Sequence, residues 1–227
     1  MNKGQLKSRT RQLAGAELDG LREFDEIGLL VDEAYRQVGR LEDWRWLQET
    51  AELETADGKK DYALPETIES LQGIQLIDDP AGGGLPVPLQ PVSRHDILTR
   101  VDRDREDRPR VYALMNADTF RVAATPDGVF TMELYGLKPL KDLAEDSDEP
   151  EFSSEFHPVI AYMAAATILD EEGQHELAEA RRSKAEEFLR LMVEHYQTSK
   201  DKTPIIVGGG DRGAPVGRRG RLWSWRV

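Results

Sequence analysis

The sequence predicts an α+β fold: a three-helix body, formed by an N-terminal helix and a C-terminal helical hairpin, with an inserted small antiparallel β subdomain and an extended C-terminal arm. Three observations support this prediction. Apolar residues recur with helical spacing near both ends of the chain, they alternate in the middle, and the last part is rich in glycine and arginine. The corresponding segments are 1–43, 44–150, 151–198 and 199–227.

The N-terminal helix is predicted over about residues 16–39, where one apolar stripe recurs at intervals of three and four residues. Its members are Leu21, Phe24, Gly28, Val31, Tyr35 and Val38. Gly39 is a plausible stop for this helix. Because one helix cannot bury such a broad stripe alone, we expect it to pack against the two C-terminal helices.

The middle of the chain has the period of β-strands. Trp44 and Trp46 would share a face of one strand, and Asp57-Gly58 predicts a hairpin turn between residues 51–55 and 60–64. A third short apolar run covers 74–77. A Pro/Gly loop and a short helix after Ser93 follow.

Three further strands are predicted after this short helix. They cover Val111–Met115, Thr119–Ala123 and Val129–Tyr135. Pro126-Asp127-Gly128 supplies the turn between the last two. Phe130, Met132 and Leu134 share one face of the last strand.

The C-terminal body is predicted as an antiparallel pair of helices. Phe156, Val159, Ile160, Met163 and Thr167 mark the first helix, and the connection contains Gly173. The second helix is marked by Leu177, Ala185, Phe188, Met192 and Tyr196.

Charge and composition exclude several classes of function. The net charge of −13 argues against general nucleic-acid binding, because neutralising phosphates requires a basic surface. The absence of cysteine excludes disulfides, thiolate metal sites and cysteine nucleophiles. No apolar run is long enough for a membrane span, and the basic first residues are not followed by a signal-type apolar stretch.

Candidate catalytic and metal-binding residues are few. Glu172-x-x-His175 has the spacing of a di-metal helical bundle, but no second copy of the motif exists, so a polar helix end is the simpler interpretation. His95 and His157 fit capping or packing roles. The acidic run 142–155 lacks the glycine and spacing of a calcium loop, which indicates a solvated linker. We therefore expect no enzymatic activity, no cofactor and no metal.

The most informative local pattern lies in the basic arm, which carries seven basic and two acidic residues. In an extended conformation its tip would place Trp223 and Trp225 on one side, with Ser224 and Arg226 on the other, and tryptophan and arginine dominate protein-interaction hot spots. Docking on a partner protein is the favoured interpretation, ahead of packing on its own body and of nucleic-acid binding. The residues concerned are Arg218, Arg219, Arg221, Leu222, Trp223, Trp225 and Arg226.

An ordered series of motifs carries a resemblance to a known family. Trp44-Arg45-Trp46-Leu47 comes first, then 61–68 (DYALPETI), 108–112 (RPRVY), 125–135 (TPDGVFTMELY) and 150–157 (PEFSSEFH). In this order, over about residues 19–170, the chain resembles the head–tail connector, or neck adaptor, proteins of tailed bacteriophages. It departs from the family pattern at Asp107-Arg108-Pro109 and at Ser153.

The resemblance implies a virion structural protein in the neck between capsid and tail, assembled in the host cytoplasm. Its partners would be the dodecameric portal protein, bound through the C-terminal arm, other copies in a ring of usually twelve subunits, and tail or nozzle proteins below. Genomic DNA would pass through the ring without specific binding, and no membrane is involved. The alternatives are a tail-tube or stopper-type component lower in the neck, a soluble interaction module unrelated to phages, and an enzyme of unrecognised class.

Overall fold

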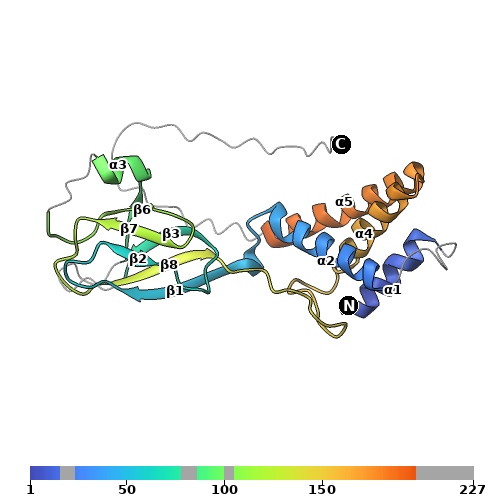
Figure 1. Ribbon diagram of the computed structural model, residues 1–227, viewed down its shortest axis with the longest axis horizontal. Helices are drawn as coiled ribbons and strands as arrows, with labels where there is room; N and C mark the ends of the chain where they lie inside the picture. The colour runs from blue at the N-terminus through green and yellow to red at the C-terminus, as the bar shows by residue number, and fades with distance from the viewer. Residues whose placement is uncertain (16–23, 78–85, 100–104, 198–227) are drawn as a thin grey trace.

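The computed structural model describes residues 1–15, 24–77, 86–99 and 105–197, and these form an elongated molecule with helices at one end and strands at the other (Figure 1). The α+β class predicted from the sequence is confirmed. No helix in the described ranges is long and apolar enough to span a membrane.

Within the described part of the chain, the helical end contains four packed helices instead of the three predicted. They are α1 (Lys3–Ala14), α2 (Phe24–Leu41), α4 (Pro158–Glu171) and α5 (His175–Gln197). Helix α4 is the central one, and α1, α2 and α5 all pack against it. It can occupy this position because its sequence is apolar on most sides, with a run of buried alanines at 164–166.

Helix α1 was missed because its buried face looks polar in the sequence. Lys3, Lys7 and Thr10 are buried together with Leu6 and Leu13. The helix begins with a reciprocal capping box, in which the Asn2 side chain accepts from the backbone of Gln5 and the Gln5 side chain accepts from the backbone of Asn2.

Helix α2 carries the predicted apolar stripe, with Ile27, Val31, Tyr35 and Val38 buried in the helical core. The predicted start of this helix, at residues 16–23, lies outside the described residues. Gly39 does not end it. A Cβ at Gly39 would come 2.9 Å from Cδ2 of Leu140, so glycine allows the segment after the β-sheets to lie close to the helix.

The C-terminal hairpin forms as predicted, and Gly173 adopts a φ of 75° in its turn. Ala185 and Met192 of α5 are buried, as expected from the spacing. Leu177 is largely exposed, so the inward-facing stripe of this helix starts one residue later, at Ala178.

The strands form two four-stranded sheets that pack face to face. The first has the order β1-β8-β3-β4 and the second has the order β2-β7-β6-β5. The first sheet contains β1 (Gln48–Glu54), β8 (Thr131–Leu137), β3 (Ser70–Leu76) and β4 (Val87–Pro88); the second contains β2 (Asp61–Ala63), β7 (Thr119–Ala123), β6 (Val111–Leu114) and β5 (Gln90–Pro91).

The two sheets enclose an apolar core with alternating inward residues, as expected for a sandwich. Met132 and Leu134 of β8 are fully buried, which confirms the predicted alternation of this strand. Between the strands that the structure describes, the pairings are antiparallel apart from the short β5–β6 pair. Helix α3 (Arg94–Thr99) covers the outer face of the second sheet, where Ile97 meets Ala113 and Ala123.

The predicted hairpin at Asp57-Gly58 is wrong in its pairing. The turn exists, with Gly58 at φ 71°, and the Tyr62 hydroxyl accepts from the Ala56 amide and donates to the Lys59 carbonyl. However, β1 pairs with β8 and β2 pairs with β7, so the two strands joined by this turn belong to different sheets. The same holds for the Pro126-Asp127-Gly128 turn, which joins β7 to β8.

Two chain segments, residues 42–47 and 138–157, connect the helical and β ends (Figure 1). In the first, Trp44 and Trp46 do not form a strand, because a short 3₁₀ helix, η2 (Arg45–Leu47), occupies this position. Trp44 is 2% exposed and its indole donates to the Val38 carbonyl at 2.6 Å. The indole therefore fixes the start of β1 to the helical body.

Candidate functional site

The predicted partner-binding residues of the arm, from Arg218 to Arg226, lie outside the described residues. The structure therefore does not place these side chains. What it describes is the body that carries the arm, whose last described element, α5, leads directly into it.

The sequence predicted a solvated linker for the acidic run between β8 and α4, but the structure shows this run bound to the helical body. Its backbone carbonyls at Asp146 and Asp148 accept from the first amides of α1, at 3.0 and 2.8 Å. These amides have no partners inside the helix, so the segment satisfies them in place of water. The acidic run is thereby attached along the N-terminal turn of α1.

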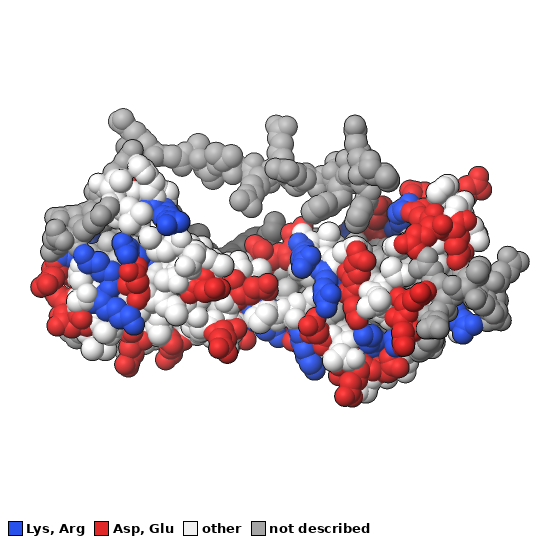
Figure 2. All heavy atoms as spheres, viewed as in Figure 1, with Lys and Arg blue, Asp and Glu red and all other residues white. Residues whose placement is uncertain are grey.

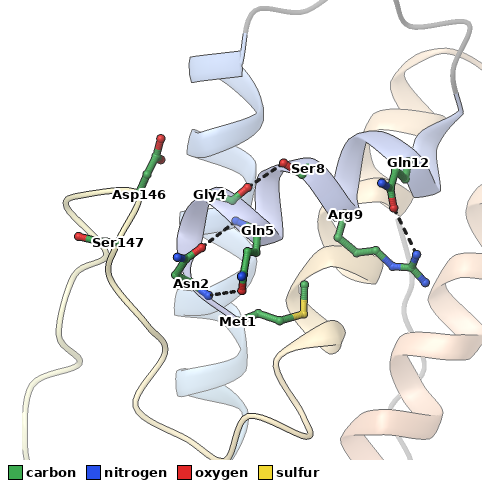
Figure 3. Close-up of a pocket in the computed structure, with 9 residues that line it drawn as sticks. All are labelled: Met1, Asn2, Gly4, Gln5, Ser8, Arg9, Gln12, Asp146 and Ser147. Atoms are coloured by element: carbon green, nitrogen blue, oxygen red, sulfur yellow. Dashed lines mark hydrogen bonds between the residues drawn. The ribbon is translucent and has the colours of Figure 1, made fainter.

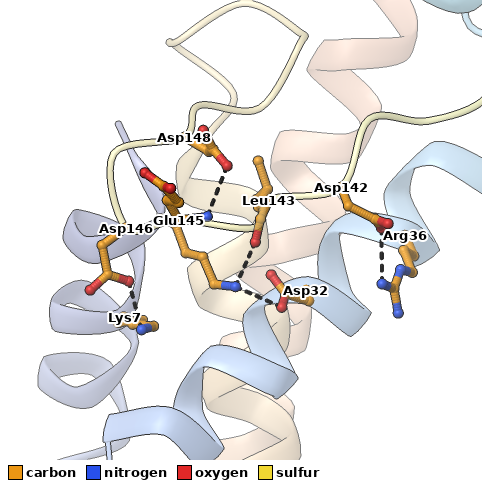
Figure 4. Close-up of polar contacts among 9 residues, drawn as sticks. Lys7, Asp32, Arg36, Asp142, Leu143, Glu145, Asp146 and Asp148 are labelled. Carbon is orange, nitrogen blue, oxygen red and sulfur yellow. Dashed lines mark hydrogen bonds and ion pairs between the residues drawn. The ribbon is translucent and has the colours of Figure 1, made fainter.

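Two lysines of α1 hold the same segment through their side chains. Lys3 Nζ lies 2.8 Å from Oδ2 of Asp32 on α2 and 2.6 Å from the Leu143 carbonyl oxygen. Lys7 Nζ lies 2.6 Å from Oδ1 of Asp146. Together these contacts connect α1 through the acidic run to α2, and Figure 4 labels Lys7, Asp146, Leu143 and Asp32 among the residues involved. We call Lys3, Lys7, Asp32 and Asp146 the α1 latch.

Further ion pairs fix both ends of the acidic run. Arg36 of α2 contacts Asp142 at 2.9 Å on the surface (Figure 4). Lys138, just after β8, contacts Glu151 at 2.7 Å, and its backbone amide donates to the Leu47 carbonyl. The Lys138 contacts join the two connecting segments to each other, so the β sandwich and the helices are coupled at the junction.

His157 is buried, with 1% of its surface exposed, and it packs edge-on against Phe152 at 5.3 Å between ring centroids. Its Nε2 lies 2.9 Å from the Phe152 carbonyl oxygen and its Nδ1 lies 2.6 Å from the Met1 amino group. Burial lowers the pKa of His157 below its ordinary value of 6.5, and the nearby amino group lowers it further. The side chain makes no capping bond; it packs against Phe152 and hydrogen-bonds the Phe152 carbonyl and Met1.

The other histidine motifs also have local roles. His175 lies 3.3 Å from Asp170, which also pairs with Arg182, and not in a carboxylate cluster with Glu172. Over the described ranges no group of three or more metal-ligating side chains occurs. Near His95, the Ser93 hydroxyl accepts from the Asp96 amide at 3.0 Å, which confirms the predicted cap of α3.

A shallow hollow lies along the outward face of α1 (Figure 3). Its lining is mostly polar and uncharged, and it includes the capping box and the Arg9–Gln12 contact of 3.4 Å. Its residues are Met1, Asn2, Gly4, Gln5, Ser8, Arg9, Gln12, Asp146 and Ser147. Of its two serines, Ser8 donates its hydroxyl to the Gly4 carbonyl at 3.0 Å within the helix.

Acidic side chains dominate the described surface of the helical end, as the face in Figure 2 shows. Basic side chains on this face lie among the acidic ones, over the helices as well as over the β sandwich (Figure 2). On the β sandwich, Arg121 forms a two-point pair with Asp61 and Arg105 pairs with Asp107. The hydrogen bonds from Arg121 hold the pKa of Asp61 below its ordinary range, and the pKa of Asp107 is lowered first by the hydrogen bond from the Arg108 backbone amide and further by Arg105.

The described part of the chain thus has two parts, a helical body and a β sandwich, which polar contacts join at the junction. The chain matches the family described as SU10 adaptor protein over residues 1–208, nearly its whole length. It therefore belongs to this family, a family of phage head–tail adaptors. No curated protein matched the chain. The family match ends before Arg218, so it does not cover the tip of the arm.

Proposed function

We propose that this chain is the adaptor subunit of a phage neck ring that joins the portal to the tail, and that it binds the portal through its C-terminal arm. The observation that carries this proposal is the combination of adaptor-family membership over residues 1–208 with a basic, tryptophan-containing segment beyond them. Trp223 and Trp225 lie two apart with arginines on either side, which suits an extended segment that docks in a groove.

A ring of subunits would compensate for the weak portal binding of a single arm. A single segment of this length offers a small contact, whereas twelve arms on one ring would bind a portal of matching symmetry with strong avidity, because each later contact is effectively intramolecular. The α1 latch and the Lys138–Glu151 pair would keep each subunit rigid enough to hold its arm in the same position.

The acidic surface supports a passive role toward DNA. With a net charge of −13 per subunit, a ring wall built from this chain would repel phosphates, and genomic DNA would pass without specific binding. We therefore propose a virion location in the neck and a purely structural role, without catalysis or cofactor.

The proposal is tested by removing residues 208–227 and measuring co-sedimentation with purified portal rings. We expect the truncated protein to keep the circular dichroism spectrum and melting temperature of the full chain and to lose portal binding. A second variant, W223A/W225A, keeps the charge and length of the arm and should weaken binding at least tenfold. Normal portal attachment by the truncated protein would refute the proposal.

A further inference from the structure

The edge strands of the two sheets differ in how well they are protected against pairing with a further strand. In the described part of the chain, β2 has three residues, and β4 and β5 have two residues each and contain Pro88 and Pro91. Short length and proline both prevent an edge from pairing with another strand. The fourth edge, β1, has seven residues and contains neither proline nor glycine. It lacks both protections.

In β1, the backbone groups of every second residue are directed away from β8, toward the edge of the sheet; of these, the Thr50 amide donates to the Glu49 side chain at 3.2 Å. The Thr55 amide donates to the Phe130 carbonyl, and the Leu47 carbonyl accepts from the Lys138 amide, both at 2.8 Å. In an antiparallel ladder, alternate residues direct both backbone groups to the same neighbour. The odd-numbered residues of β1 therefore direct their backbone groups to β8. The backbone amides and carbonyls directed away from the sheet are those of Gln48, Thr50, Glu52 and Glu54.

The side chains of β1 indicate what kind of strand fits beside it. Ala51 and Leu53 face the sandwich core and are only partly buried, so an apolar side chain placed next to them would extend that core. On the opposite face, Glu52 and Glu54 are exposed, and Glu133 of β8 lies directly beside Glu52. Neither β1, β3 nor β8 contains a basic residue.

The same charges exclude a simple pairing of two copies through β1. Two such strands side by side would place glutamates opposite glutamates, which is destabilising. A partner that is basic on its outward face and apolar on its inward face would instead complement both surfaces.

We propose that the free edge of β1 accepts an extended segment of another virion protein by strand addition, with basic side chains beside Glu52 and Glu54 and apolar ones beside Ala51 and Leu53. The identity of the partner as a virion protein rests on the proposed function. The strand addition itself concerns the β sandwich, which is separate from the arm, so each can fail without the other.

The test uses the full-length chain and a fluorescein-labelled ten-residue peptide in which lysine and valine alternate. A block peptide of the same composition, with five lysines followed by five valines, controls for general attraction to an acidic protein. We expect the alternating peptide to bind at least tenfold more tightly in fluorescence anisotropy, and to shift the amide NMR signals of Thr50, Glu52 and Glu54.

Two variants locate the binding. Glu52→Pro removes an outward backbone amide and leaves the β1–β8 hydrogen bonds intact. It should weaken the binding of the alternating peptide at least tenfold. If this variant does not fold, E52K/E54K tests the same edge through charge alone, with the same expected loss. Equal binding of the block peptide, or unchanged binding by the folded variants, would overturn strand addition at β1.

A third peptide, residues 218–227 of this chain, tests the identity of the partner. We expect it to bind β1 no more tightly than the block peptide. If it shifts the β1 amides and binds more tightly than the alternating peptide, the arm of a neighbouring copy is the occupant, and the assignment to another protein is wrong.

Discussion

Replacing Lys3 with methionine tests whether the α1 latch holds the helical body together. The lysine side chain is about nine-tenths buried, and its ammonium group is the partner of Asp32 Oδ2 at 2.8 Å and of the Leu143 carbonyl at 2.6 Å. Methionine keeps most of the packing volume and removes the charge. Asp32 would then be left as an unpaired carboxylate with 20% of its side chain exposed.

The expected loss of stability follows from this geometry. Breaking a buried ion pair by removing one partner costs about 3–5 kcal/mol, and partial solvent access at Asp32 reduces this to about 2–4 kcal/mol. Lys7→Met is the matched control, because its partner Asp146 is 58% exposed and can return to water. That variant should lose only about 0–1 kcal/mol.

Urea unfolding followed by circular dichroism measures these differences, and a double variant separates their causes. K3M/D32L removes both charges and should recover to within about 1–2 kcal/mol of the wild type, because two apolar groups replace the pair. If K3M loses less than about 1 kcal/mol, or if K7M loses as much as K3M, Lys3 does not hold the latch.

Three further substitutions or conditions test other parts of the structure. Gly136→Ala would place a Cβ 2.5 Å from Ile68 Cγ2 and in overlap with the Ser70 carbonyl. In the same urea assay it should lower the unfolding free energy by at least about 1–3 kcal/mol. Gly73→Ala is the control: the nearest atom to its Cβ is 3.9 Å away, and it should cost less than about 1 kcal/mol. Trp44→Ala removes a buried indole and should cost about 3–5 kcal/mol in the same measurement; a loss below about 1 kcal/mol would show that Trp44 does not anchor β1. Because the pKa of His157 is lower in the folded state, the unfolded state binds the proton first as the pH falls. The contribution of His157 to stability should therefore be complete above pH 6.5 and decrease below it. In H157N the unfolding free energy should lack this part of its pH dependence, and identical slopes of unfolding free energy against pH for both proteins would contradict the lowered pKa.

Sequence patterns predicted the elements of this fold better than their partners. The stripe of α2 and the alternation of β8 depend on local spacing, and both appear as expected. Strand pairing depends on distant segments. The turn at Gly58 has the right local chemistry, yet the Tyr62 hydroxyl stabilises it without a ladder between the flanking strands. A turn signal therefore does not identify which strands pair.

Helix α1 illustrates the same limit for buried charge. Lysine at positions 3 and 7 lowers the apparent hydrophobicity of its inner face, and the acids that make burial possible lie far along the chain, at Asp32 and Asp146. The spacing of Leu6, Thr10 and Leu13 was a usable signal, and so was the capping pair of Asn2 and Gln5. For the candidate binding arm, sequence remains the source of the prediction, because the described residues end before it.

We propose that this adaptor lies against the portal and binds it through its C-terminal segment. A cryo-electron microscopy reconstruction of the isolated neck tests it most directly. We predict a ring of this chain immediately below the portal, with continuous density from the end of α5 to tryptophan side chains seated in the portal wall. A ring separated from the portal by another protein, or an arm folded onto its own helices, would contradict the account.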